Sequence, residues 1–555
     1  MENITAASTS KESIESVSNF DAVKDLQKLG YAQELTRTRG LLHILFMTLA
    51  IMAVPFGLSA PIATSLVAGG PTVMVWGFLM VSLFCQALAL SMAEICSKYP
   101  TAAGAYYWTY RLAGPRYGLM CSWINGWLTM VGVWTISLSV TFGTAQLLVA
   151  GVGIYYPEWI ATTWQTYLIF LAVTAFATGF GIFFNELLPL ADVLSAVWTL
   201  LGMIVMLICL SVKAASGRRP ASFALGAFDP SASGWTPGWS FFIGLLPSGG
   251  GFSSSCSSRE RSYHFTAYTY SAIGMIASMC EEVKHPVRQV PRAMAWSIPV
   301  GFLTGLFFIL PVVFTLPDIS LLLSVSSGQP IGILFTSVMG SRSGGFGMWF
   351  IIFIIGIFCA ISICCAASRA TWSFARDKAI PYSKFFARVN RGFLEGVPVN
   401  AYLLSTLIQV LLGLIFLGSS AAFNAFVGVA VICLGASYAM PVLLSVLNRR
   451  REMHDAPYNL GRLGYFINGF AVVWVMFEIV LFSMPAVIPV TSTSMNYAPV
   501  VFVGFAVMSA VWYIISGRQH FTGPPIPHEA WAQKDKLSQD AESEAHTTQV
   551  LSRNL

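Results

Sequence analysis

Charged residues are scarce in this sequence. Asp, Glu, Lys and Arg make up 10% of its 555 positions, against roughly 25% in an ordinary soluble chain. A soluble fold of this length would need a charged surface, and these residues are too few to provide one. Because surface that faces lipid removes that need, the shortage excludes an ordinary water-soluble protein.

The patterns of metal-binding and thiol chemistry are also missing. The ten cysteines lie mostly inside apolar blocks, where they act as small hydrophobic residues, and they form no C-x-x-C pair and no zinc spacing. The seven histidines fall at predicted helix ends, loops or tails, and no paired interior acids suggest a membrane-embedded enzyme. We therefore predict no cofactor, no metal site, no catalytic residue and no nucleic-acid partner.

Long apolar blocks are what the sequence has in abundance, and apolar types fill 55% of it. A helix of roughly 20 apolar residues crosses the hydrocarbon core of a bilayer. The sequence predicts an all-α membrane protein of about twelve spanning helices, over 41–68, 72–97, 118–152, 159–183, 190–213, 238–280, 295–317, 346–369, 399–418, 422–447, 465–488 and 496–516.

Polar segments flank this predicted membrane domain of residues 40–517. Residues 1–39 are expected to be a disordered tail and residues 518–555 a second polar tail, and the polar start shows no signal peptide. Lys and Arg gather in the short loops that follow even-numbered helices, which predicts that both tails lie in the cytosol. The loop 213–237 opposes this pattern because it is expected outside and yet carries basic residues, and the loop between helices four and five is acidic.

Two predicted helices contain residues that interrupt helical hydrogen bonding. The first holds Pro55, Gly57 and Pro61 within 53–61, and the sixth holds Gly274 within 270–278. Interrupted segments at matching positions of two halves indicate a transporter's binding site. Because these helices are five apart, an odd number, the second half enters the membrane from the opposite side. We therefore predict a 5+5 inverted repeat followed by two C-terminal helices.

The backbone groups at such breaks cannot face lipid, so they must face a polar cavity or its ligand. Helix starts carry free amides that attract a carboxylate, and helix ends carry free carbonyls that attract a cation. A zwitterion or an amine therefore suits this site. A simple proline kink is the alternative at either break alone, and the matched pair favours a site.

Several motifs resemble the amino acid–polyamine–organocation transporter superfamily. Glu281-Glu282-Val283-Lys284-His285-Pro286 with Val290-Pro291-Arg292-Ala293 is similar to the signature that follows helix six, and 93–108 resembles the second-helix motif. Residues in three further segments resemble the fungal branch of this superfamily, which includes amino acid, GABA and choline permeases. These segments are 368–381, 397–401 and 495–497.

This resemblance covers about residues 40–520 and carries functional expectations. It implies a secondary active transporter that imports amino acids, GABA, choline or related amines across a fungal membrane by alternating access. We expect the plasma membrane, with the vacuolar membrane as the alternative. The branch is functionally mixed, so substrate identity does not carry over. A non-transporting nutrient sensor with the same fold is the competing interpretation.

The resemblance places eight residues of the two breaks at the substrate: Phe56, Gly57, Leu58, Ser59, Tyr270, Ile273, Gly274 and Met275. Asn125 is a further candidate because Trp123 and Trp127 flank it in the third helix, and aromatic faces can hold a quaternary ammonium. Ordinary packing of an apolar helix is the alternative for Asn125.

Charged residues, four of them acidic, supply the candidates for gating and coupling. Glu94, Glu281, Glu282 and Lys284 lie near cytosolic helix ends, either in a gate or paired with loop residues. Glu478 lies deep in helix eleven, where an ionisable group suggests function. It either carries a coupling proton or makes an interhelical hydrogen bond. A proton is the expected coupling ion, since helix eight offers only Ser362 where related sodium-driven transporters use several hydroxyls.

An insertion, residues 248–265, interrupts the predicted sixth helix. It is rich in Ser and Gly and carries Arg259, Glu260 and Arg261, whereas its flanks would join into one spanning helix. Three interpretations compete: a translated short intron, a real loop near the external mouth, or a misplaced helix. We favour the intron, because the family pattern runs directly from one flank into the other.

Overall fold

The computed structural model describes residues 22–59, 62–231, 233–245, 267–323, 330–390, 396–485, 488–491 and 495–525. Within these ranges the regular elements are helices, and the only β-type pairing is an isolated bridge between Arg39 and Val283. Eleven helices among the described residues are long and apolar enough to cross a membrane. The predicted all-α membrane fold is therefore confirmed.

The elements that cross the membrane are, in chain order, α2 (Leu41–Met52) with α3 (Val54–Ser59), η1 (Val73–Gly77) with α5 (Phe78–Lys98), α6 (Ala105–Tyr155), α7 (Thr163–Phe183), η2 (Asn185–Leu187) with α8 (Leu188–Lys213), α12 (Pro286–Phe314), α15 (Arg342–Arg376), α17 (Val399–Gly413) with α18 (Ile415–Gly418), α19 (Ser420–Leu447), α20 (Leu463–Phe482), and α21 (Ala498–Trp512) with η5 (Tyr513–Gly517) and α22 (Arg518–His520).

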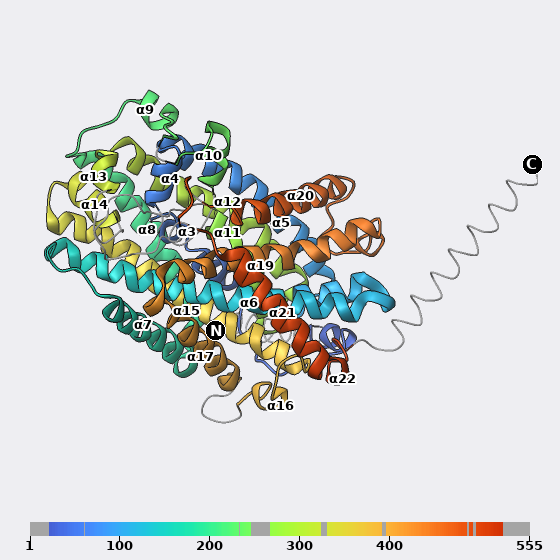
Figure 1. The fold of residues 1–555 in the computed structure, drawn as a ribbon. Coiled ribbons are helices and arrows are strands. Elements are labelled where there is room, and N and C mark those ends of the chain that lie inside the picture. Colours follow the sequence, from blue (N-terminus) through green and yellow to red (C-terminus); the bar gives the residue numbers. More distant parts are fainter. Residues whose placement is uncertain are drawn as a thin grey trace, which may run out of the picture.

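The predicted sixth helix is represented by α10 (Pro237–Ile243), α11 (Ala267–Ser271) and the 3-10 helix η3 (Ile273–Glu282). The insertion predicted at 248–265 lies outside the described residues. The remaining short elements are α4 (Ile62–Ala68), α9 (Ala221–Gly226), α13 (Ile319–Leu323), α14 (Ile331–Met339), α16 (Ser383–Phe386) and η4 (Arg451–Met453). Helices α9, α13 and α14 lie at one end of the bundle, and α16 and α22 at the other (Figure 1).

Two helices begin earlier than predicted, for local reasons. Helix α6 starts at Ala105 rather than 118, because Gly114 adopts φ 76° and ψ 177° and lets two helical segments continue around a kink at Pro115. Helix α12 starts at Pro286 rather than 295. A proline in the first turn lacks only an amide that would have no helical partner there, so it favours that start.

Helices α6, α15 and α19 form the centre of the bundle, where α6 packs against both of the others. In α19 the apolar stretch is 72% buried, whereas in α21 it is only 11% buried, so α21 lies at the periphery. Close approach of α6 and α19 depends on Gly132. A Cβ at that position would stand 2.7 Å from Cγ of Leu434.

Gly132→Val therefore tests the central packing. We expect it to lower the free energy of unfolding by about 1–3 kcal/mol, because added methyl groups would force α6 and α19 apart. Gly153→Val in the same helix is the control, since a Cβ at Gly153 meets no atom within 4 Å. Thermal unfolding of the purified proteins measures both, and equal loss in the two variants would contradict the assigned packing.

Candidate functional site

The first break separates α2 from α3 at Ala53. This residue adopts φ 40° and ψ 51°, a left-handed conformation that side chains with a Cβ rarely take. The four predicted residues of this break, Phe56, Gly57, Leu58 and Ser59, follow in α3 and are all buried. The interrupted backbone is thus enclosed by protein and does not face lipid.

The second break lies between α11 and η3. Ala272 separates the two elements, and η3 then continues for ten residues as a 3-10 helix, a geometry that rarely persists beyond a few residues and often marks a hinge. The predicted residues Tyr270, Ile273, Gly274 and Met275 are all buried here. The sequence prediction of an interruption is confirmed at both positions.

Glycines let other side chains approach the two breaks closely. A Cβ at Gly57 would stand 2.6 Å from Oγ1 of Thr269, so the glycine lets α3 approach α11. A Cβ at Gly274 would collide with the ring of Tyr438 in α19. The hydroxyls of Thr269 and Tyr438 are buried, and neither has a hydrogen-bond partner within the described part of the chain. The region around the breaks therefore holds polar groups that the described part of the protein leaves unsatisfied.

The side chains of the breaks are anchored to other helices. Ser82 of α5 donates a hydrogen bond to the hydroxyl oxygen of Tyr270 at 3.1 Å, and the Tyr270 ring stacks on Phe78. The ring of Phe56 lies against Gly356 of α15, where a Cβ would come within 2.9 Å of it. Helices α5 and α15 thus hold the two breaks in place.

Asn125 has a structural partner away from the breaks. Its amide nitrogen donates to the carbonyl of Ser437 in α19 at 2.7 Å. The neighbouring Trp123 donates to Oγ of Ser509 in α21 at 3.1 Å. These contacts join α6 to α19 and α21, and among the described residues no hydrogen bond joins Asn125 to either break.

Glu478 of α20 is buried and faces the interior of the bundle. Its Oε2 atom lies 3.7 Å from where a Cβ of Gly435 in α19 would stand, and α20 packs against both α5 and α19. Cys85 of α5 lies within electrostatic range of both the Glu478 carboxylate and Tyr270. No described residue forms an ion pair or hydrogen bond with this carboxylate. It is therefore a buried acid without a partner in the part of the chain that the structure describes.

A group of buried ion pairs begins where η3 ends, and we call it the ion-pair layer: Arg39, Asp192, Glu282 and Arg369. Glu282 contacts Nε of Arg369 at 2.8 Å and Nε of Arg39 at 3.2 Å, and Arg39 reaches Asp192 of α8 at 2.6 Å. None of the four side chains is more than 8% exposed. The layer joins the segment before α2 to η3, α8 and α15.

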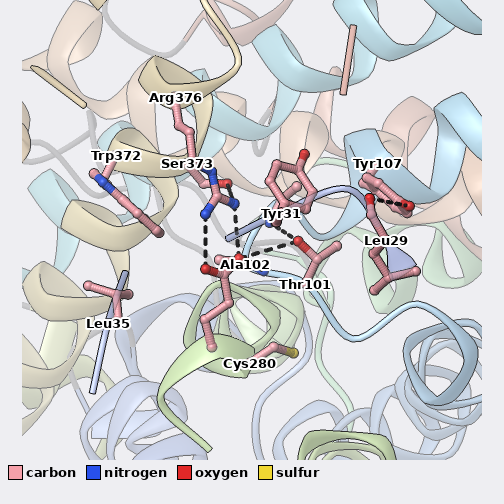
Figure 2. Close-up of polar contacts among 12 residues, drawn as sticks. Leu29, Tyr31, Leu35, Thr101, Ala102, Tyr107, Cys280, Trp372, Ser373 and Arg376 are labelled. Carbon is pink, nitrogen blue, oxygen red and sulfur yellow. Dashed lines mark hydrogen bonds and ion pairs between the residues drawn. The ribbon is translucent and has the colours of Figure 1, made fainter. Parts of the chain in front are cut away.

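The neighbouring Glu281 is held by Arg376 at the end of α15. Two guanidinium nitrogens of Arg376 each donate to this carboxylate at 2.9 Å, and the amide of Ala102 donates to it at 3.1 Å. The Arg376 guanidinium also lies over the rings of Tyr31 and Trp372, at 4.0 and 4.4 Å from their centroids. Figure 2 shows Arg376, Tyr31 and Ala102 converging from different parts of the chain.

Residues 22–39 fall in the span predicted as a tail, and in the structure they pack against this end of the bundle. The hydroxyls of Tyr31 and Tyr106 donate to the carboxylate of Asp377 at 2.8 and 2.7 Å. Burial raises the pKa of Asp377 to about 6, while Arg376 and the two phenols oppose that rise. The carboxyl is therefore mainly ionised at neutral pH and can accept both hydrogen bonds.

The other predicted gating residues lie outside the ion-pair layer. Glu94 pairs with Arg450 at 2.5 Å and accepts from the amide of Leu460 at 2.9 Å, so it is bound to the loop between α19 and α20. The backbone amide of Lys284 donates to the carbonyl of Arg39 at 3.0 Å. Sequence reasoning missed Arg39 and Asp192, and it counted Arg369 and Arg376 only as topology and family signals.

Broken helices that contact through glycines, with unsatisfied hydroxyls and a buried ion-pair layer beside them, are the features of a membrane transport protein. Comparison with known proteins agrees. The amino acid permease family matches residues 40–505, and the chain belongs to that family. Neither the family nor the relatives below are enzymes.

Three relatives illustrate the range of the family. An amino-acid permease of Arabidopsis thaliana is 32% identical over 90% of this chain and 95% of its own length. A choline transporter of Saccharomyces cerevisiae is 30% identical over 84% of this chain and 79% of its own. A polyamine transporter of the same yeast is 31% identical over 92% of this chain and 80% of its own.

Glu282→Gln tests how much the ion-pair layer contributes to the stability of the fold. We expect it to lower the free energy of unfolding by about 3–5 kcal/mol, because two buried guanidinium groups would lose their shared anion. Asp25→Asn is the control, since Asp25 and Lys28 form an exposed pair worth about 0–1 kcal/mol. Unfolding of both purified variants measures the difference. A loss from Glu282→Gln no larger than that of the control would contradict this assignment.

Proposed function

We propose that this permease is a secondary active transporter that imports amino acids, GABA, choline or related amines by alternating access, coupled to protons. The observation that carries the proposal is the pair of buried helix breaks, with unsatisfied hydroxyls next to both of them. Backbone amides and carbonyls released at such breaks can bind the carboxylate and the ammonium of one substrate.

The substrate site in this proposal comprises the residues of the two breaks together with the third-helix candidate: Phe56, Gly57, Leu58, Ser59, Asn125, Tyr270, Ile273, Gly274 and Met275. Family membership supports this location. Asn125 has the least structural support among these residues, because its amide is already hydrogen-bonded to Ser437.

The ion-pair layer serves as the cytosolic gate of this transporter. The basic residues of the loops after even-numbered helices favour a cytosolic location for this end of the bundle. Since Glu282 and its two arginines are buried, opening the path toward the cytosol requires these pairs to separate and to become hydrated. Glu281 with Arg376 closes the same end.

Glu478 carries the coupling proton. A buried carboxylate without a cationic partner among the described residues can gain and lose a proton without breaking an ion pair. Helix α20, which carries Glu478, packs against α5, and Ser82 of α5 bonds Tyr270 of the second break, so a change of charge at Glu478 can reach the site through α5. Sodium is the weaker choice, because Oγ of Ser362, the hydroxyl expected to bind it, already contacts Asp192 at 3.2 Å.

Uptake of radiolabelled GABA, choline and a panel of amino acids in permease-deficient yeast tests the proposal against the alternative of a non-transporting nutrient sensor. We expect saturable uptake that a protonophore abolishes. The chain should be tested with and without residues 248–265. No saturable uptake by either form would defeat the transporter and favour the sensor.

Glu478→Gln tests the coupling role. We expect the variant to lose the rise in uptake that low external pH gives the wild type, because the amide cannot carry a proton, while substrate exchange continues. Asp455→Asn changes an exposed carboxylate and serves as the control. Initial uptake rates measured across a range of external pH decide the matter, and an unchanged pH dependence in Glu478→Gln would rule the role out.

A further inference from the structure

The side chains of Thr269 and Tyr438 each carry a hydroxyl and each lie against a glycine of one break. Thr269 stands over Gly57 of the first break, and the ring carbon that bears the Tyr438 hydroxyl stands over Gly274 of the second. The two side chains are each only 3% exposed, and neither hydroxyl has a partner in the described ranges. A buried hydroxyl without a hydrogen bond lowers stability unless a ligand or water supplies one.

The charges of the interior limit what that ligand can be. Six carboxylates are buried in the described part of the chain: Glu94, Asp192, Glu281, Glu282, Asp377 and Glu478. The first four form ion pairs with arginines, and Asp377 accepts hydrogen bonds from two tyrosines. Among these six, only Glu478 stays without a partner, so the described part of the interior offers one free negative charge.

We propose that the Thr269 and Tyr438 hydroxyls hydrogen-bond the substrate and set its selectivity, and that this substrate is an amino acid zwitterion with a single ammonium group. The inference rests on the proposed transport function and deepens it. Hydroxyls donate and accept, so they can bind either end of a zwitterion without adding charge. The backbone amides and carbonyls at the breaks form the remaining hydrogen bonds with the substrate.

Two other substrate classes of the relatives fit this interior less well. A polyamine brings several ammonium groups, and burying them requires as many anions, which this interior does not offer. Choline brings a cation without a carboxylate, so the amides freed at the breaks would find no anion. A zwitterion can bind the amides and the carbonyls at the breaks, and it can also bind both hydroxyls.

Kinetics of uptake test the proposal with variants that remove only a hydroxyl. Tyr438→Phe and Thr269→Val are expected to raise KM for the preferred neutral amino acid about fivefold to tenfold, the change typical of one lost hydrogen bond. The maximal rate per folded transporter should change less than twofold. Uptake of labelled spermidine by the wild type should stay at background.

The chain offers matched controls. Tyr402 of α17 and Thr174 of α7 are also buried and also lack a hydrogen-bond partner among the described residues, but neither is among the nearest neighbours of Gly57 or Gly274. Tyr402→Phe and Thr174→Val should therefore leave KM unchanged. Melting temperatures of all four purified variants show whether any change in uptake comes from loss of fold.

The outcomes distinguish failure of this inference from failure of the proposed transport function. Absence of uptake by the wild type defeats the proposed function and the inference together. If saturable uptake is present, an unchanged KM in both Tyr438→Phe and Thr269→Val overturns the inference alone. An equal rise in the control variants overturns it as well, and so does spermidine uptake as efficient as that of neutral amino acids.

Discussion

The carboxylate of Glu282 holds one end of this bundle together. It lies between Arg39 and Arg369, and Arg39 in turn reaches Asp192, so three charges besides its own are fixed around it. Removing one member would leave buried charges unpaired, which is why such groups act as a unit. The segment before α2, the end of the second break and the helices α8 and α15 all take their positions from this group.

The breaks depend on a second constraint, since their backbone groups cannot face lipid. Gly57 and Gly274 allow Thr269 and Tyr438 to lie directly over the interrupted helices, so the broken backbone is enclosed while polar atoms remain beside it. The site and the ion-pair layer are continuous along the chain, because η3 begins at the second break and ends at Glu282. A change of conformation at the break can therefore reach the ion pairs through a single short element.

Hydropathy and helix-breaking residues predicted much of this fold, for physical reasons. Spanning helices need long apolar runs, so eleven of them were recognisable from hydropathy. Proline and glycine marked the first break, and Gly274 marked the second. The strained residue itself, Ala53, was not identifiable, because alanine is not a residue type that marks a positive φ such as its 40°. The early start of α6 was missed because Gly114 and Pro115 read as a helix end, although they allow a kink.

The pairings of the site were beyond a single sequence. Arg39 and Glu282 lie 243 positions apart, and nothing in local composition says that they meet. Residues 22–39 are polar enough to read as a tail, but Tyr31 and Arg39 among them are buried. Glu281 and Glu282 were visible candidates because of their motif, whereas Thr269 and Tyr438 became candidates only once their unsatisfied hydroxyls were placed beside the breaks.

Transport toward the cytosol requires the ion-pair layer to open, and labelling of Cys280 tests this most directly. This thiol immediately precedes Glu281 and is fully buried. Its alkylation by N-ethylmaleimide, followed by mass spectrometry of its peptide, should be slow at rest. Alkylation of Cys280 should become faster with substrate under a proton gradient, and faster still in the Arg39→Gln variant. Cys433, which is buried in α19, should stay protected. Equal labelling of Cys280 in all these conditions would contradict the account.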